Sequence, residues 1–171
     1  MNKYRIESAR LKEWDYSSHA AYFVTICTYG HKNYFGKMNG TIVELSTIGK
    51  IVKEEWLHTQ EIRKDIRLDE YIIMPNHLHG IILLLHDEIP EGTKISNLSN
   101  IIKGFKSSVS KRIQNEGNSE FKWQSRFYDH VIRTEESLGN IRNYIISNPD
   151  KWELDEYNRK EEESFLKNIK K

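Results

Sequence analysis

The sequence predicts an α+β fold in which helices pack on one mainly antiparallel sheet. Short runs rich in β-branched and aromatic residues, which favour strands, are interspersed with longer segments whose apolar residues recur every three or four positions, as in core-facing helices. The predicted strands come in pairs that are joined by short turns. The resulting order of elements, β-β-α-β-β-α-β-α, is typical of a sandwich of ferredoxin-like type.

The first half of the chain contains four predicted strands and one helix. The strands are residues 21–28, 41–44, 66–74 and 77–85. Pro75 separates the last two strands at a point where it removes no hydrogen bond of the sheet. The helix begins after Ser46, whose side chain can cap it, and ends near residue 63.

The second half contains two predicted helices with one strand between them. The first helix spans residues 95–114 and has a regular apolar stripe, and the strand follows at residues 128–132. The second helix begins after Thr134 and ends near Asn148, because Pro149 cannot continue it.

The chain is predicted to form one domain with two short extensions, since 171 residues are a normal size for a single domain. Residues 1–20 are interpreted as an N-terminal arm, residues 21–152 as the domain, and residues 153–171 as a C-terminal helix or tail.

Composition narrows the classes of function. The charges of the 26 basic and 25 acidic residues nearly cancel, so the net charge does not indicate a nucleic-acid-binding protein. Cys27 is the only cysteine, which excludes a disulfide framework and a cysteine-based zinc site and suits a reducing cytoplasm. No apolar run reaches 18 residues, so we expect a cytoplasmic protein without a membrane span.

The stretch from Met74 to Gly80 is the strongest candidate for chemistry. His77 and His79 stand two positions apart in a predicted strand, so their side chains leave the same face with Cα atoms about 6.5 Å apart. Two imidazoles at that spacing can bind one metal ion, while Leu78 points into the core. The alternative is that both histidines are solvated on an edge strand.

Tyr144 and Asn148 are a second candidate pair. They are four residues apart in the last predicted helix, so both side chains project from one face. The simpler interpretation is that Tyr144 belongs to the buried stripe and that Asn148 only ends the helix before Pro149.

A local excess of positive charge lies on the helix predicted at residues 95–114. The stretch 94–115 contains five basic residues and no acidic one. It is interpreted either as a solvated helix face or as a surface that contacts phosphates. The candidate nucleic-acid-binding residues are Lys103, Lys106, Lys111 and Arg112.

Together these motifs resemble a known superfamily. The His–hydrophobic–His stretch at residues 76–80 resembles that of the HUH endonucleases, and residues 68–77 resemble the single-tyrosine (Y1) transposases among them. Residues 123–133 and 144–152 resemble the branch associated with repetitive extragenic palindromes (REPs). The resemblance extends from about residue 22 to residue 152.

The resemblance implies a metal-dependent endonuclease and strand transferase that acts on single-stranded or hairpin DNA. His77 and His79 would bind a divalent ion, Mg²⁺ or Mn²⁺, and Asn148 would be the third ligand, where other members have glutamine. Tyr144 would be the nucleophile that forms a 5′-phosphotyrosine. The superfamily works as monomers or homodimers, and the tyrosine serves its own subunit or a partner's.

Three alternatives stay open at this point. The same domain can bind hairpin DNA without cleaving it. A metal-dependent hydrolase also uses a His-x-His pair, although the barrel that usually carries it needs roughly 250 residues. In the third alternative, a nucleic-acid chaperone or regulator carries the histidine pair incidentally.

Overall fold

The computed structural model describes residues 20–85 and 96–158, and the rest of the predicted arm and tail lies outside these ranges. The strands are β1 (Ala20–Cys27), β2 (Gly36–Asn39), β3 (Ile42–Leu45), β4 (Ile66–Ile73), β5 (His77–Leu84) and β6 (Tyr128–Ile132). The helices are α1 (Thr47–Glu61), α2 (Leu98–Asn115) and α3 (Glu135–Ile146), with the 3₁₀ helices η1 (Tyr29–His31) and η3 (Pro149–Leu154). None of the helices in the described ranges is long and apolar enough to cross a membrane.

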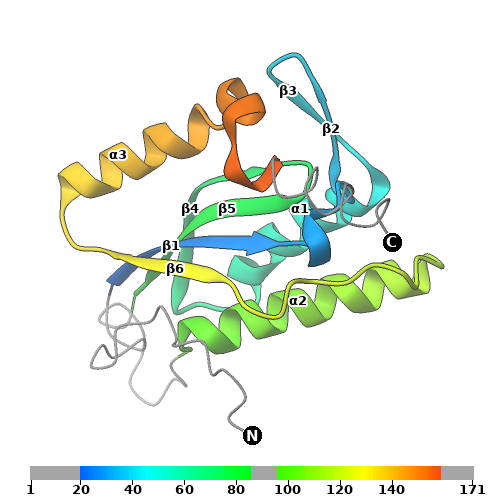
Figure 1. Cartoon of the computed structure of the whole chain (residues 1–171). Helices are drawn as coiled ribbons and strands as arrows, with labels where there is room; N and C mark the ends of the chain where they lie inside the picture. Colours follow the sequence, from blue (N-terminus) through cyan, green and yellow to red (C-terminus); the bar gives the residue numbers. More distant parts are fainter. Residues whose placement is uncertain (1–19, 86–95, 159–171) are drawn as a thin grey trace, which may run out of the picture.

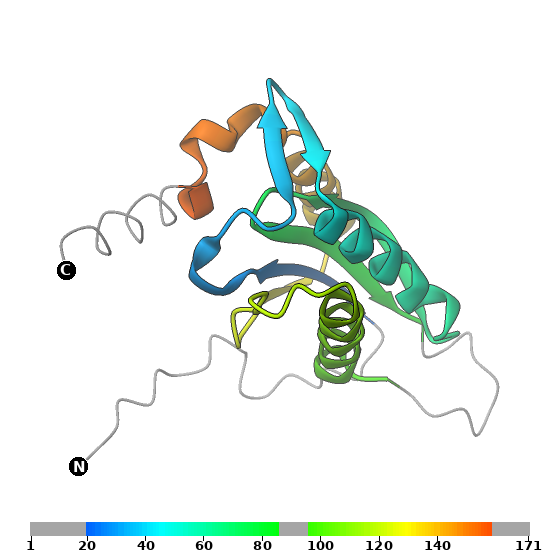
Figure 2. The same ribbon diagram turned by 90° about the vertical axis from the view of Figure 1, so that its right-hand side faces the viewer.

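The main sheet has four strands in the order β4-β5-β1-β6, and every neighbouring pair is antiparallel. Helices α1 and α2 cover one face of this sheet, and α3 covers the other (Figures 1 and 2). The path β1-α1-β4-β5-α2-β6 is the ferredoxin-like topology, so the predicted fold class is confirmed.

One strand was not predicted. The sequence predicted a single short strand at residues 41–44 in this part of the chain, but β2 pairs with β3 in a separate two-stranded sheet. This hairpin projects beyond the main sheet next to η3 (Figure 1). β2 contains only one apolar residue, Met38, so it lacks the alternation that identifies a half-buried strand.

The two faces of the main sheet are separated by the alternation of side chains along β1. Tyr22, Val24 and Ile26 are fully buried in the large core beneath α1 and α2. Phe23 and Thr25 point to the opposite face, where α3 lies. A small apolar cluster supports that second face, and it consists of Phe23, Ile81, Ile132, Leu138 and Ile145.

β5 approaches α1 closely at Gly80. A Cβ atom added to Gly80 would overlap the ring of Trp56, which is fully buried between the helix and the strand. The absence of a side chain at Gly80 therefore lets the indole ring lie directly against the strand that carries the histidine pair.

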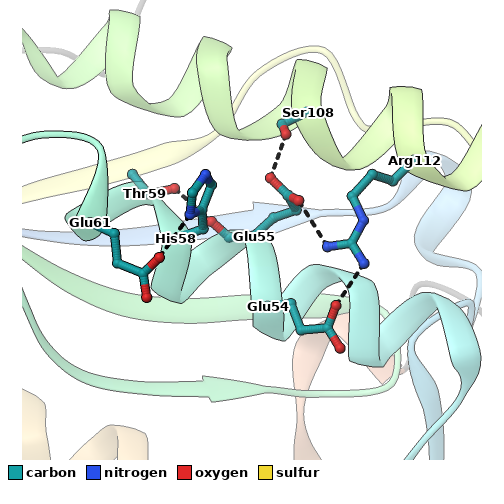
Figure 3. A network of polar contacts seen from close by, with 7 residues as sticks. All are labelled: Glu54, Glu55, His58, Thr59, Glu61, Ser108 and Arg112. Atoms are coloured by element: carbon teal, nitrogen blue, oxygen red, sulfur yellow. Dashed lines mark hydrogen bonds and ion pairs between the residues drawn. The ribbon is translucent and has the colours of Figure 1, made fainter.

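A polar network joins α1 to α2 above the large core (Figure 3). The carboxylate of Glu55 accepts hydrogen bonds from the hydroxyl of Ser108 and, at 2.9 Å, from Arg112, which also donates to Glu54. Burial alone would raise the pKa of Glu55, but these hydrogen bonds hold it below its usual value. Within the same network, Thr59 donates to the Glu55 carbonyl at 2.8 Å.

Helix α3 is fixed to the sheet by an ion pair at its middle. Arg142 donates two hydrogen bonds to Asp69 on β4, next to an irregularity in the pairing of β4 with β5. The hydrogen bonds from Arg142 lower the pKa of Asp69 despite its partial burial. A bidentate guanidinium–carboxylate pair restricts orientation as well as distance, so it sets how α3 lies on this face.

Candidate metal and tyrosine site

His77 and His79 lie on β5, an inner strand of the main sheet, and both point toward α3. Their side chains are fully buried, at 0% and 1% exposure, and their Nε2 atoms are 3.0 Å apart. The spacing of two residues in a strand brings the two imidazoles together, as the sequence indicates.

Nδ1 of each imidazole has a hydrogen-bond partner. This arrangement leaves the lone pair of Nε2 available to bind a metal ion. Asn76 donates its amide protons to the carbonyl oxygens of His31 and Tyr157 at 2.9 and 3.1 Å. Its Oδ1 is therefore an acceptor, and His77 Nδ1, 2.8 Å away, carries the proton. Thr25 Oγ1 lies 2.8 Å from Nδ1 of His79 and can accept its proton in the same way.

Both histidines are neutral at neutral pH. Burial lowers the pKa of His77 well below its ordinary value, with further lowering by His79 and His31, and burial lowers the pKa of His79 to about 3. A metal ion needs a neutral imidazole with a free lone pair, so burial and the Nδ1 partners prepare both rings as ligands.

Tyr144 projects from α3 toward the histidine pair. Its hydroxyl lies 3.4 Å from Nε2 of His79, and its ring packs edge-on against Phe23 at 6.0 Å between centroids. Burial and the charge of Asp155 raise the pKa of Tyr144, whereas a hydrogen bond with Asn148 lowers it. The net shift is upward, so the hydroxyl is protonated at neutral pH.

Asn148 lies just beyond α3 rather than inside it. The helix ends at Ile146, and Asn148 precedes η3, but its backbone is still helical, with φ −61° and ψ −41°. Its side chain is almost fully buried, and Oδ1 has no hydrogen-bond partner in the described residues. A buried amide oxygen without a partner is costly, and binding a metal ion would compensate it.

Asp155 is a candidate ligand that the sequence did not reveal. One carboxylate oxygen of Asp155 and a ring nitrogen from each of His77 and His79 all lie within 4.8 Å of one another. η3 follows Asn148 and ends just before Asp155, whose carboxylate lies beside the histidines. In the sequence it is one acidic residue in a stretch rich in lysine and glutamate, which gives no signal of a ligand.

These donors fit a divalent ion. Two nitrogens about 2.1 Å from one ion at a right angle would be about 3.0 Å apart, which matches the separation of the two Nε2 atoms. With the Asp155 carboxylate, the described residues bring together two nitrogen donors and one oxygen donor, a set that suits Mn²⁺ and Mg²⁺.

Aromatic rings from the C-terminal segment cover His77. The ring of Tyr157 lies 4.6 Å and that of Trp152 6.1 Å from the imidazole, measured between centroids. Tyr157 also stacks on His31 at 5.6 Å. Residues as far as Tyr157 therefore contact the site, while the domain boundary at residue 152 stays a prediction.

The predicted nucleic-acid-binding residues lie on α2, on the opposite side of the sheet from Tyr144. Lys103 and Lys111 are exposed. Lys106 donates to the carbonyl oxygens of Gln124 and Arg126 at 2.7 and 3.3 Å, and burial lowers its pKa to about 8.

Arg112, the fourth of these residues, pairs with Glu54 and Glu55 (Figure 3). Two of the four side chains therefore have structural partners, and a role of this group in DNA binding stays a prediction.

The fold and the site together are those of the single-tyrosine HUH proteins, the class that the sequence motifs resemble. They combine a ferredoxin-like sheet, a His–hydrophobic–His pair on one strand and a tyrosine on a neighbouring helix. A family model of IS200-like transposases matches residues 45–148, more than half of the chain, and the chain belongs to this family. An uncharacterized protein of Haemophilus influenzae is 32% identical over an alignment of 163 positions, and the alignment covers 87% of this chain and 91% of that protein.

A solved structure agrees with the fold. It is that of a REP-associated tyrosine transposase bound to a REP hairpin, and it superposes with a TM-score of 0.58 at 20% sequence identity. The match covers 85% of this chain and 74% of the other. At this identity the likeness establishes the common fold.

Proposed function

We propose that this protein is a metal-dependent endonuclease and strand transferase that nicks hairpin-associated, single-stranded DNA through a 5′-phosphotyrosine at Tyr144. One observation carries the proposal: in a chain of the IS200-like transposase family, the Tyr144 hydroxyl lies 3.4 Å from a buried, neutral histidine pair. A purely structural role does not require that Asn148, which forms a hydrogen bond with Tyr144, keeps a buried oxygen without a partner among the described residues.

The metal ligands in this proposal are His77, His79 and Asn148, with Asp155 as a further donor. These residues would hold a divalent ion, which would supply Lewis-acid stabilisation of the scissile phosphate. The two imidazoles and the amide are uncharged, so among these four donors only the Asp155 carboxylate would offset part of the charge of the ion. Thr25 and Asn76 hold the rings in the orientation that ligation needs.

Tyr144 performs the covalent step. Its oxygen attacks phosphorus and forms the phosphotyrosine bond while the bond from phosphorus to the 3′ oxygen breaks. The phenolic proton passes to solvent, which reaches Tyr144 because the residue is 41% exposed, and the departing 3′ oxygen takes up a proton. The phosphodiester energy is retained in the new bond, so rejoining needs no nucleotide cofactor.

The proposed substrate is a DNA hairpin with a single-stranded flank. The support is the family match together with the fold shared with a transposase that was solved on a REP hairpin. We place the chain in the same REP-associated branch, as its motifs at residues 123–133 and 144–152 suggest. Because Tyr144 and the histidines face each other within one chain, a monomer contains every proposed catalytic group.

A second function is supported by the burial of the site. Trp152 and Tyr157 cover His77, which has no exposed surface, so a phosphate cannot reach the pair while these rings stay in place. A protein that binds hairpin DNA without cleaving it would not need a phosphate to reach the histidines, so these rings would not impair its function.

The decisive experiment is a search for the covalent adduct. Hairpin oligonucleotides with randomised single-stranded flanks are incubated with the protein and Mn²⁺ or Mg²⁺, and the products are separated under denaturing conditions. We expect a protein–DNA adduct and a free 3′-hydroxyl fragment with the ion, and neither with a chelator. Binding without an adduct under every ion condition would favour the non-cleaving function.

A further inference from the structure

A cavity lies on the same face of the sheet as the histidine pair. Its volume is about 400 Å³, within the lower part of the range of small-ligand pockets. It is formed by β1, by β6 and by the first half of α3, which follows directly on β6 (Figure 1). The side chains that matter here are Phe23, Tyr128, His130, Glu136, Ser137 and Asn140.

Phe23 is a wall shared by this cavity and the candidate catalytic site. Its ring stacks on His79 at 5.3 Å and lies edge-on to Tyr144 at 6.0 Å, measured between centroids. On the cavity side the same ring faces Tyr128 at 6.4 Å. The cavity is therefore one aromatic ring away from the proposed nucleophile.

The first half of α3 extends the stripe on which Tyr144 lies. Ser137, Asn140 and Tyr144 follow one another at intervals of three and four residues, which places them along one face of the helix. Asn140 precedes Tyr144 by about 6 Å along the helix axis. A nucleotide whose phosphate lies at Tyr144 would thus have its base within reach of the cavity.

The lining suits an uncharged, planar ligand with a hydrogen-bonding edge. Tyr128 is 49% exposed, so part of its ring is accessible for stacking. The side chains of His130, Ser137 and Asn140 form no hydrogen bond with any described residue, so their donors and acceptors are available.

The charge of the lining argues against a phosphate. It includes the carboxylate of Glu136 but no lysine or arginine, so an anion would be repelled. A carboxylate accepts instead from the exocyclic amino groups that adenine, cytosine and guanine carry and thymine lacks.

We propose that this cavity binds one unpaired nucleobase next to the scissile phosphate, stacked on Tyr128 and contacted at its edge by Asn140 and Glu136. The inference rests on the proposed function and adds to it a residue-level source of sequence preference. It predicts that thymine is the least favoured base at that position.

The test is an abasic scan of the strand combined with variants of the cavity. Wild-type protein is titrated with a hairpin that it nicks, and each nucleotide flanking the nick is replaced in turn by an abasic site. We expect the dissociation constant to rise about tenfold at one of the flanking positions, as for the loss of a stacked base. Tyr128→Ala should bind the intact and the abasic strand equally weakly.

Glu136→Gln tests the reading of the base edge, with Glu135→Gln as the matched control on the same helical turn. Thymine at the sensitive position should weaken binding of the wild type and of Glu135→Gln, and this discrimination should fall to within about twofold in Glu136→Gln. Asn140→Ala should reduce discrimination among the other three bases and provides a second readout if Tyr128→Ala does not fold.

Two results would overturn the inference, and they differ from failure of the proposed function. If the wild type nicks DNA but the abasic penalty is unchanged in Tyr128→Ala, the cavity does not hold the base. If Glu136→Gln and Asn140→Ala both keep the preferences of the wild type, the edge is read elsewhere. If the wild type neither binds nor nicks any hairpin, the proposed function fails and this inference fails with it.

Discussion

The two faces of the main sheet are built for different purposes. Beneath α1 and α2 the strands contribute closely packed apolar side chains, among them Tyr22, Val24 and Ile26, to one large core. Toward α3 the same strands contribute Thr25, His77 and His79, which are buried polar residues supported by only a small apolar cluster.

The contrast indicates that stability and chemistry are divided between the faces. Burial of apolar surface on the α1/α2 face is the main source of folding free energy. On the α3 face, burial instead depresses the pKa values of two histidines, which opposes folding below neutral pH. Substitutions on the two faces should therefore separate loss of function from loss of stability.

The largest effect is expected from Tyr144→Phe. The change removes the hydroxyl near His79 and keeps the ring against Phe23, so we expect complete loss of the covalent adduct. The free energy of unfolding should stay within about 0.5 kcal/mol of the wild type. Denaturing electrophoresis and urea denaturation measure the two quantities. Tyr29→Phe, at an exposed tyrosine, is the control, and an adduct formed by Tyr144→Phe at the wild-type rate would identify another nucleophile.

Thr25→Val should weaken metal binding without removing a ligand. The valine cannot accept the proton of His79 Nδ1, so the ring loses its orienting partner, and Mn²⁺ affinity should fall about 10- to 100-fold in calorimetry. Thr59→Val makes the same change at a buried threonine on α1 and should leave the affinity unchanged. Equal affinities in both variants would mean that Thr25 does not support a metal site.

Gly80→Ala should destabilise the protein by disturbing the packing of α1 on the α1/α2 face of the main sheet. The new Cβ overlaps the buried ring of Trp56, and such overpacking costs about 1–3 kcal/mol, measurable as a lower urea midpoint. Gly139→Ala in α3 is the control, because its Cβ meets no atom within 4 Å and the added helix propensity should be neutral or stabilising. A Gly80→Ala protein as stable as the wild type would show that Trp56 can move aside.

Stability should fall on mild acidification in the presence of a chelator. Unfolded histidine titrates near pH 6.5, whereas in the folded protein the pKa of His79 is about 3 and that of His77 is also depressed. Below pH 6.5 the unfolded chain binds more protons, so each histidine removes up to about 1.4 kcal/mol of stability per pH unit. Urea denaturation at pH 7 and pH 5 measures the loss. His79→Gln should show a smaller loss than the wild type, and an identical pH dependence would contradict the assigned cause.

The smallest effect is expected from the exposed lysines of α2. Lys103→Ala combined with Lys111→Ala should weaken hairpin binding and reduce the salt dependence of the binding constant by about one to two counterions. Lys50→Ala, at an exposed position on α1, serves as the control. An unchanged salt slope would show that these two side chains are solvated and do not contact phosphates.

The sequence predicted most of the fold because its regular elements carry strong patterns. α2 repeats apolar residues along one face over its whole length, and β1 and β5 are dense in β-branched and aliphatic residues. β2 was not predicted because it has few apolar side chains of its own. It pairs with β3, and this pairing depends on tertiary context.

The candidate site was only partly predictable. His77 and His79 could be named because their spacing in a strand fixes which way their side chains point, whereas Tyr144 was singled out by the resemblance to the transposases. The structure brings these three side chains together. Asp155 could not be named, since its place beside the histidines depends on the path of the chain through η3. The hydrogen-bond partners of Lys106 could not be predicted from the sequence either, because they are carbonyl oxygens in a loop without regular structure.

The ion pair between Arg142 and Asp69 has a consequence for genetics. It ties the helix that bears Tyr144 to the sheet of its own chain, so the tyrosine meets the histidines of the same polypeptide. If the proposed function holds, a protein that lacks Tyr144 could not supply its intact histidines to a protein that lacks His77, and the reverse would also fail. The alleles that encode these two proteins would then fail to complement each other in a cell that expresses both.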